Sequence, residues 1–358
     1  MLLFLLFLVP CAAAQNIQTM LVGRFLNGLV GSAFLTVAAG TVADLFASSE
    51  IEEPMMLYTA APFIGPVLGP VIGGFINSFA SWRWSFYVLL IWSDVLQIAL
   101  IFVPETHHPT ILHRKAMVLR KESGNSAYKS ASEISNSQTS LSTALIHSLY
   151  RPFQLLALDL MCLFLCLYSA VILGIFYLFF GVFPLVFHTN HDFDLWQAGL
   201  TFPPSRLACS SGHAKEAGME PPAKGEPEFR LPPAIMGAVF VTAGIFWFGW
   251  ATYRGVHWIV PLIALGFFGF WIFLFSIIWT FLVDAYPKYA ASALEANTFA
   301  RCMFAAAFPL LSKQMYKKLG YQWATSLLAF ITLAMLPLPY AFFVYGKSLR
   351  AKSKFAST

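Results

Sequence analysis

Residues 160–187 read LMCLFLCLYSAVILGIFYLFFGVFPLVF, an apolar run without a charged side chain. A bilayer core of about 30 Å needs about 20 apolar residues in helical form to cross it. Because hydrocarbon offers the backbone no hydrogen-bond partner, a lipid-exposed run is either a helix or part of a closed barrel. The run lacks the alternating polarity of a barrel strand. It therefore predicts a membrane-spanning α-helix.

Similar runs recur along the chain. The 358 residues are 58% hydrophobic and only 11% charged, whereas a soluble domain carries about 25% charged residues. This composition argues strongly against a water-soluble globule. The predicted fold is an all-α, polytopic membrane helix bundle. Its nine apolar segments are 2–14, 19–46, 55–80, 83–103, 153–187, 233–252, 257–283, 289–312 and 321–345.

The first segment has two interpretations. A short apolar core followed by small residues is typical of a secretory signal peptide. However, residues 1–14 lack the basic start of such peptides and begin inside the hydrophobic run. This favours a truncated membrane helix, with the signal peptide as the alternative.

The charges predict the orientation of the chain. Three polar stretches hold 21 of the 39 charged residues: 9 in 104–152, 8 in 205–231 and 4 in 345–358. The first and last are rich in Lys and Arg, which favour the cytoplasmic side of a membrane. An even number of crossings must then separate them, but only five apolar segments lie between them.

We expect the missing crossing between residues 196 and 232. The apolar piece 197–204 is too short to span, and 205–225 is rich in Ser, Gly, Pro and charge, as disordered linkers are. The polar insert 205–231 therefore stands where a helix is expected. The alternatives are a re-entrant segment or an unusual crossing by 153–187.

The predicted organisation has four parts. An N-terminal helix bundle (1–103) is followed by a cytoplasmic linker (104–152), whose Ser/Asn-rich middle is expected to be flexible. A C-terminal helix bundle (153–346) contains the polar insert, and a basic cytoplasmic tail (347–358) ends the chain.

Charges inside apolar segments are functional candidates because each costs roughly 2.5–3.5 kcal/mol on insertion scales. Arg24 lies near the start of its segment and either has a functional role or snorkels to the interface. Asp94 is mid-segment and suits buried pairing or a proton role. Glu295 lies near a helix start, where a carboxylate suits the dipole. Arg301 is six residues further on, so the two point to different faces. Asp159 fits an interfacial position.

Residues 65–74 (GPVLGPVIGG) form the most distinctive local pattern. Glycines four apart create a smooth helix face that lets a neighbour approach closely. Prolines four apart remove backbone donors and bend the helix. We expect a bent, tightly packed membrane helix. The pattern consists of Gly65, Pro66, Gly69, Pro70, Gly73 and Gly74.

Other chemistries lack a recognisable signal. The sequence has no nucleotide-binding glycine loop, no Gly-x-Ser-x-Gly elbow and no basic nucleic-acid patch. Its eight histidines are spread over several loops, and Cys162 and Cys166 fit buried small hydrophobes. We expect no cofactor, metal or nucleic-acid partner and no enzyme activity. An intramembrane enzyme is the alternative of a different class.

Taken together, the motifs resemble a fungal major facilitator superfamily transporter of the drug:proton antiporter type with twelve helices. Gly65-x3-Gly69-Pro70-x2-Gly73-Gly74 is similar to the family's fifth-helix antiporter signature. Arg24, Asn27, Gly28 and Gly31 resemble its fourth-helix signature, where the arginine is implicated in proton coupling. Residues 104–122 resemble the start of its central loop, and residues 281–309 resemble its tenth-to-eleventh helix region.

The resemblance implies a secondary transporter that exports small amphipathic molecules or drugs in exchange for protons. Arg24 would tune a proton-binding group, and the helix of residues 65–74 would seal the pathway against leak. The implied partners are a small-molecule substrate, protons and the lipid bilayer. We expect a monomeric, multi-pass protein of the plasma membrane.

The chain also departs from the family pattern. The family's first two helices have no counterpart, Met1 would fall within the third helix, and the eighth helix is absent where the crossing count placed the gap. Because only nine of the twelve helices are recognised in the sequence, a second hypothesis is that the chain is a non-functional truncated remnant or a gene-model fragment of such a transporter. Glu295 stands where a small apolar residue is expected, so the resemblance gives it no role.

Overall fold

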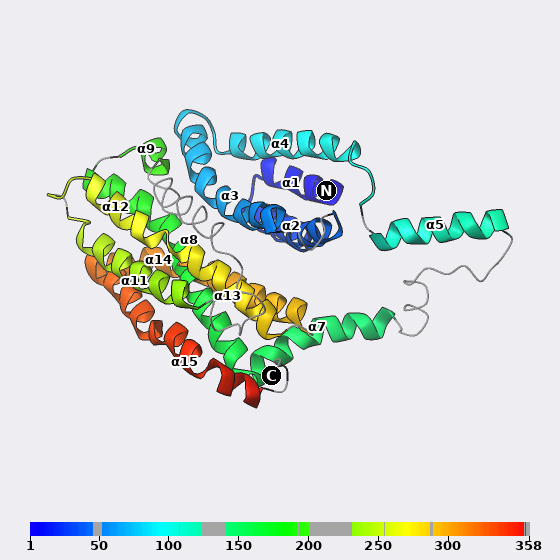
Figure 1. The fold of residues 1–358 in the computed structure, drawn as a ribbon. Coiled ribbons are helices and arrows are strands. Elements are labelled where there is room, and N and C mark those ends of the chain that lie inside the picture. Colours follow the sequence, from blue (N-terminus) through cyan, green and yellow to red (C-terminus); the bar gives the residue numbers. More distant parts are fainter. Residues whose placement is uncertain are drawn as a thin grey trace. The chain divides into compact units, whose positions relative to one another are not determined.

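The computed structural model describes residues 1–45, 52–106, 108–123, 141–191, 193–200, 231–253, 255–286, 289–353 and 355. Every regular element within these residues is a helix (Figure 1), which confirms the all-α prediction. The helices are α1 (Leu2–Ala12), α2 (Ile17–Leu45), α3 (Glu52–Phe79), α4 (Arg83–Ile101), α5 (His108–Ser123), α7 (Leu141–Leu158), α8 (Leu160–His191), α9 (Leu195–Gly199), α11 (Pro232–Trp250), α12 (Ile259–Phe268), α13 (Trp271–Ala285), α14 (Ala290–Met335) and α15 (Pro337–Lys352).

Several of these helices have the length and composition of membrane spans. Within the described residues, four helical stretches are long and apolar enough to cross a bilayer. Shorter apolar helices add to them at Leu2–Ala12, Ile64–Phe79 and Ile259–Phe268. The four long stretches are Arg83–Ile101, Leu160–Asn190, Pro232–Trp250 and Ala290–Ala351.

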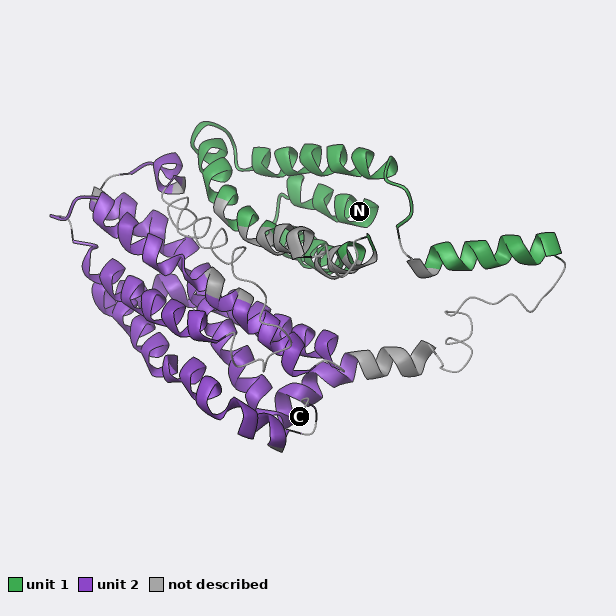
Figure 2. Ribbon diagram, viewed as in Figure 1, with its two compact units in different colours: residues 1–144 green, residues 145–358 purple. Residues whose placement is uncertain are grey.

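The chain divides into two compact units, residues 1–144 and residues 145–358 (Figure 2). In the first unit, α1 packs against α2 and α4 around Leu8, Cys11 and Phe86. Many large apolar side chains of this unit face outward; Phe102, for example, is 82% exposed. Such a surface is unfavourable in water and suits helices that face lipid.

The second unit is built on the pairing of α8 with α14. The Ser169 hydroxyl of α8 donates a hydrogen bond to Asn297 Oδ1 of α14 at 2.5 Å. Further along, a Cβ added to Gly181 would lie 3.1 Å from Ser312 Oγ. Because both residue numbers rise together, the two helices run parallel. Glycine on α8 permits this close approach of α14.

Helices α8 and α11 also run parallel to each other. The ring of Phe183 lies 5.3 Å from that of Phe248, and Asn190 Nδ2 donates to the Thr252 carbonyl at 2.5 Å. The end of α8 and the start of α11 therefore lie at opposite ends of this unit. Residues 201–230 lie outside the described residues, so the polar insert and the absent eighth helix stay predictions.

Several helix boundaries differ from those expected from hydropathy. The apolar segment 153–187 is interrupted at Asp159, where α7 ends and α8 begins. Asp159 Oδ1 accepts hydrogen bonds from the backbone N–H groups of Met161 at 3.0 Å and Cys162 at 3.3 Å, the geometry of a helix N-cap. The Asp159 side chain is buried within this unit, and its other oxygen accepts from the Ser353 hydroxyl.

The remaining differences lie between residues 257 and 345. The segment 257–283 forms two helices, α12 and α13, with a break at Gly269 and Phe270. The expected segments 289–312 and 321–345 are joined by helix up to Met335, apart from Gly320, whose backbone is non-helical with φ 76° and ψ 168°. Glycine reaches positive φ without steric cost, which lets the chain turn there.

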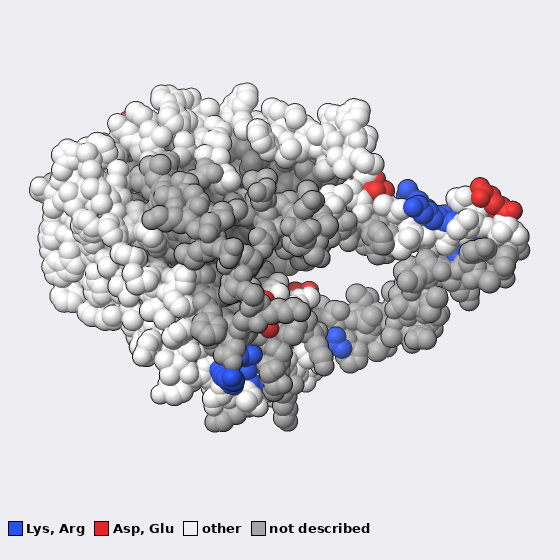
Figure 3. Space-filling model, viewed as in Figure 1, with Lys and Arg blue, Asp and Glu red and all other residues white. Residues whose placement is uncertain are grey.

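Helix also occupies most of the described part of the linker 104–152, in α5 and the first part of α7. Helix α5 contains Arg120 and Lys121 in its last turn, where cations stabilise the helix dipole. Residues 124–140, the middle that was expected to be flexible, lie outside the described residues. Figure 3 shows charged side chains gathered on α5 and near the C terminus, with largely uncharged surfaces elsewhere on the described helices in this view.

Candidate functional site

Arg24 lies on α2, and its side chain is exposed. The guanidinium carbon is 4.9 Å from the centre of the Phe86 ring on α4, a cation–π contact. Asn27, one turn further along α2, donates from Nδ2 to the Phe4 carbonyl of α1 at 2.9 Å. These two residues therefore connect α2 to both of its partners in the small core of the first unit. Gly28 is exposed, and an added Cβ would meet nothing within 4 Å.

Glycines on either side of Asn27 determine how closely α2 approaches α1. A Cβ added to Gly23 would lie 2.8 Å from Cys11 Sγ, and one added to Gly31 would lie 3.4 Å from the Phe4 ring. Gly23 was not predicted from the sequence. Its signal was the spacing of eight residues, slightly more than two helical turns, between Gly23 and Gly31, which brings both glycines to one helix face.

The glycine–proline pattern lies on α3, which is assigned as continuous helix from Glu52 to Phe79. Gly65 and Gly69 are exposed, and nothing described lies within 4 Å of a Cβ added to either. The nearest atom to a Cβ on Gly73 is Asn77 Nδ2 of the same helix, at 3.9 Å. Pro70, Gly73 and Gly74 are partly buried. Within the described residues of the first unit, this face of glycines is thus unoccupied.

The other intramembrane charges differ in their surroundings. The side chains of Asp94 on α4 and Glu295 on α14 are exposed and form no ion pair within the described residues. Arg301, by contrast, is only 9% exposed. The different burial of Glu295 and Arg301 agrees with the prediction that they point to different faces of one helix.

Arg301 is held among aromatic rings in the second unit. Its guanidinium carbon lies 4.1 Å from the ring centre of Phe275 and 5.0 Å from that of Trp279, both on α13. One terminal nitrogen, Nη2, donates to the Thr298 hydroxyl at 3.3 Å. No carboxylate forms an ion pair with Arg301 in the part of the chain that the structure describes.

A second polar side chain lies one helical turn before Arg301. Asn297 is fully buried, and its Oδ1 accepts the hydrogen bond from Ser169 of α8. The three helices α8, α13 and α14 thus meet around Asn297 and Arg301. The roles of Asn297, Ser169 and Trp279 were not predicted from the sequence. A polar amide four residues from an arginine in an apolar helix was a signal for Asn297.

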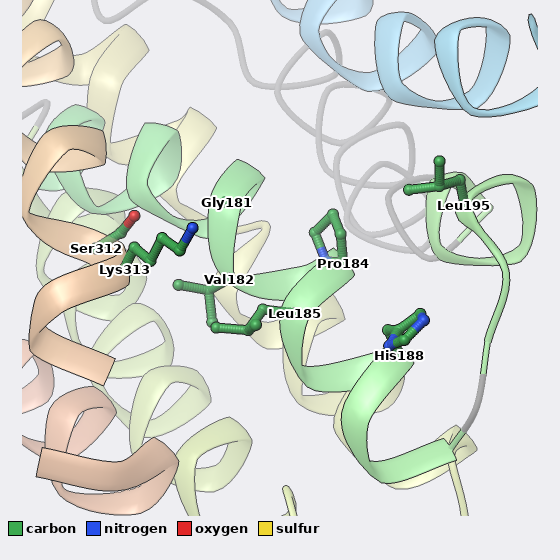
Figure 4. A pocket seen from close by; sticks show the side chains of 8 residues that line it. All are labelled: Gly181, Val182, Pro184, Leu185, His188, Leu195, Ser312 and Lys313. Atoms are coloured by element: carbon green, nitrogen blue, oxygen red, sulfur yellow. The ribbon is translucent and has the colours of Figure 1, made fainter. Parts of the chain in front are cut away.

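A cavity of about 480 Å³ opens on the same α8–α14 pair (Figure 4). Its size is within the range of small-molecule pockets, about 300–1,000 Å³. Ser312 is eleven residues beyond Arg301, about three helical turns, so the two share a face of α14 and lie about 16 Å apart along it. The cavity is lined by Gly181, Val182, Pro184, Leu185, His188, Leu195, Ser312 and Lys313.

The chain resembles known transporters over most of its length. A family model described as "Major Facilitator Superfamily" matches residues 1–309. The efflux pump atB of Aspergillus terreus is 51% identical, with 99% of this chain and 78% of that protein aligned. The probable drug/proton antiporter YHK8 of Saccharomyces cerevisiae is 41% identical, with 96% of this chain and 69% of that protein aligned.

Solved structures show the same fold at lower identity. The proton:xylose symporter XylE of E. coli superposes with a TM-score of 0.61 at 18% identity, over 97% of this chain and 78% of XylE. The human organic anion transporter MFSD10 superposes with a TM-score of 0.59 at 19% identity, over 94% of this chain and 75% of MFSD10. At these identities the comparison supports the fold alone.

Proposed function

Because this chain belongs to the major facilitator superfamily, we propose that it exports small amphipathic molecules or drugs in exchange for protons, as a monomer in the plasma membrane. The family makes it an integral, multi-pass membrane protein and a secondary transporter. The coupling ion and the substrate class are the parts of the proposal that need an experiment.

The main support for the proposed proton coupling is the environment of Arg24. It keeps a permanent positive charge on an apolar helix and forms no ion pair within the described residues. The Phe86 ring holds its guanidinium in place. A fixed positive charge lowers the pKa of a nearby carboxylate, which favours proton release. Arg24 would tune a proton-binding group in this way, and Asn27 would fix the position of α2 through its hydrogen bond to α1.

The helix of residues 65–74 is proposed to seal the pathway. The Gly65 and Gly69 positions are free of side-chain neighbours in their unit, so the backbone of α3 is accessible for close approach by another helix. Gly73, Gly74 and Pro70 complete this pattern. Gly28 would provide a similar opening on α2.

Transport is proposed to proceed by alternating access, with one helix bundle (1–103) rocking against the other (153–346) around a midplane site. The linker 104–152 and the basic tail 347–358 are proposed to stay in the cytoplasm, because their Lys and Arg residues favour that side.

Proteoliposomes test the proposal. The full chain is reconstituted with an acidic lumen, and accumulation of rhodamine 6G is followed by fluorescence. We expect accumulation that a protonophore abolishes. Arg24→Gln is expected to reduce it about tenfold or more, the effect of one or more pKa units at the coupling site. Arg114→Gln, an exposed arginine of α5, is the matched control and should leave the rate unchanged.

The competing hypothesis is a remnant that folds without transporting. It predicts a monodisperse protein in the liposomes and the same dye signal as in empty vesicles. Flux that is insensitive to the proton gradient would also refute proton coupling. Equal rates for Arg24→Gln and wild type would remove Arg24 from the mechanism while leaving transport itself intact.

A further inference from the structure

The last described residues of the chain are tied to the start of another helix of the second unit. Helix α15 ends at Lys352. The next residue, Ser353, donates its hydroxyl hydrogen to Asp159 Oδ2, where α8 begins (Figure 1). The two residues are 194 positions apart in the sequence, so this is a tertiary contact and not a local cap of α15.

Phe355 extends this contact to α14. Its ring meets the ring of Tyr289 edge to face, with 5.7 Å between the ring centres, and Tyr289 is the residue directly before α14. The guanidinium carbon of Arg151 lies 5.9 Å from the centre of the same Tyr289 ring. Ser353 and Phe355, bound to Asp159 and Tyr289, form what we call the tail contact. It joins the end of α15 to the starting ends of the parallel pair α8 and α14.

The Ser353 hydroxyl is fully used in the tail contact. A serine hydroxyl has one hydrogen to donate, and Ser353 gives it to Asp159. Its oxygen also accepts the backbone N–H of Phe355 at 3.2 Å, a local side-chain to backbone bond typical of serine. Any group attached to this oxygen removes the hydrogen, so the bond to Asp159 would be lost.

The sequence around Ser353 is strongly basic. Residues 349–354 read LRAKSK, with Arg350 three positions before the serine and a lysine on each side of it. Protein kinases with an acidic substrate cleft select such serines by complementary charge. Among the hydroxyl residues of 345–358, only Ser353 has an arginine at this spacing. This marks it as the preferred target in the tail.

The tail contact hides this target. Arg350 is only 7% exposed, and Ser353 is partly buried. The Ser353 N–H donates to the carbonyls of Leu349 and Arg350 at 3.2 and 3.0 Å, so the last turn of α15 must open before an extended segment can enter a kinase. Helix ends open more readily than helix interiors. A kinase would therefore select the open form, and phosphorylation and the tail contact exclude each other.

We propose that Ser353 is a phosphorylation site for a kinase that reads basic residues, and that its phosphate releases the tail contact. The Ser353 oxygen forms a bond to the γ-phosphorus of ATP, the bond from that phosphorus to the β,γ-bridging oxygen breaks, and ADP leaves. The hydroxyl proton passes to a base of the kinase. The phosphate, with a charge of about −1.5 to −2, then faces the Asp159 carboxylate and repels it.

This inference goes beyond the proposed export function. It takes from that proposal only the cytoplasmic location of the tail, where ATP and protein kinases are found. Asp159 would stay in place after release, because its other oxygen accepts two backbone N–H groups of α8.

The first test measures phosphorylation of the full chain in detergent by calmodulin-dependent protein kinase II with radiolabelled ATP, and mass spectrometry identifies the site. We expect phosphate at Ser353, which Ser353→Ala removes and Ser357→Ala leaves unchanged. Tyr289→Ala keeps the kinase motif but removes the ring that holds Phe355. It should raise the initial rate about 2- to 10-fold, the effect of one edge-to-face pair. Tyr150→Ala, which removes an exposed ring of α7, should keep the wild-type rate.

The second test follows release of the tail by hydrogen exchange of single backbone N–H groups. Phosphorylation should speed exchange at Ser353 and Phe355 about tenfold or more, the effect of losing a hydrogen bond to a charged group. The N–H groups of Met161 and Cys162, which Asp159 caps, should keep their protection. In Asp159→Asn, phosphorylation should change exchange at the tail by less than about threefold, because an amide is uncharged and can donate to the phosphate.

Several results would overturn the inference. Absence of phosphate at Ser353 in both wild type and Tyr289→Ala would refute the site. Equal rates in these two proteins would refute competition between the kinase and the tail contact. Exchange that stays the same or slows after phosphorylation, or an equal effect in Asp159→Asn, would refute release by charge repulsion. None of these measurements requires transport, so their failure would leave the export proposal standing, and a lack of proton-dependent flux would leave the Ser353 site standing.

Discussion

Gly244 is the position where a single methyl group should have the largest effect on the second unit. A Cβ added there would lie 2.6 Å from the backbone nitrogen of Phe268 and 3.0 Å from the backbone oxygen of Ala264. Both atoms belong to the backbone of α12, so no side-chain rotation relieves the contact. Gly244→Ala therefore forces α11 and α12 apart.

The expected loss follows from two opposing effects. Overpacking a well-packed interior costs typically 1–3 kcal/mol, and a contact of 2.6 Å with backbone belongs at the upper end of that range. Replacing glycine by alanine inside a helix gains about 1 kcal/mol in propensity. The net destabilisation is about 2 kcal/mol, which lowers the Tm of a domain of 150–250 residues by about 4–8 °C.

Thermal unfolding of the full chain in detergent, followed by circular dichroism, measures this change. Gly237→Ala is the matched control on the same helix. Its added Cβ would lie at an ordinary 3.5 Å from the Phe270 carbonyl oxygen, so the gain in propensity should leave its Tm equal to or above that of wild type. A Gly244→Ala protein that unfolds at or above the wild-type temperature would show that α11 and α12 do not pack backbone to backbone.

Two further substitutions address local structure in the same thermal assay. Asp159→Ala removes the N-cap of α8 and should lower the free energy of unfolding by about 0.5–2 kcal/mol. Asp159→Asn keeps an oxygen acceptor and should lose less stability. Equal losses of stability in the two variants would argue against capping by Asp159. Gly320→Ala places a Cβ at φ 76° and ψ 168°, a backbone region that is essentially confined to glycine, and should cost about 1–3 kcal/mol. Gly320→Asn should cost as much, because asparagine tolerates only the left-handed helical region; no loss in Gly320→Ala would refute this backbone conformation.

Hydropathy was sufficient to predict the all-α fold and the approximate position of each described apolar helix. It misplaced boundaries where one residue decides them. The average over the segment 153–187 hides Asp159, whose side chain starts a new helix by capping its backbone donors. In the same way, a polar stretch between 312 and 321 looked like a loop, although the chain stays helical up to Gly320.

The candidate site was predicted only in part. An arginine in an apolar segment is visible in the sequence because charge is expensive in lipid, so Arg301 could be selected. Its surroundings could not, because Ser169 and Asn297 are 128 residues apart and meet only when α8 packs on α14. Trp279 looked like any other aromatic residue of a membrane helix until its ring was found beside the guanidinium.

The crossing count links the sequence to the geometry of the second unit. The Lys and Arg residues of 104–152 and of the C-terminal tail predict that both stretches lie on one side of the membrane, which would need an even number of crossings between them. Within the second unit, the contacts of Phe183 with Phe248 and of Asn190 with Thr252 show that α8 and α11 run parallel. The two arguments are independent, since one uses charge and the other uses contacts within the unit. Both concern the connection between α8 and α11.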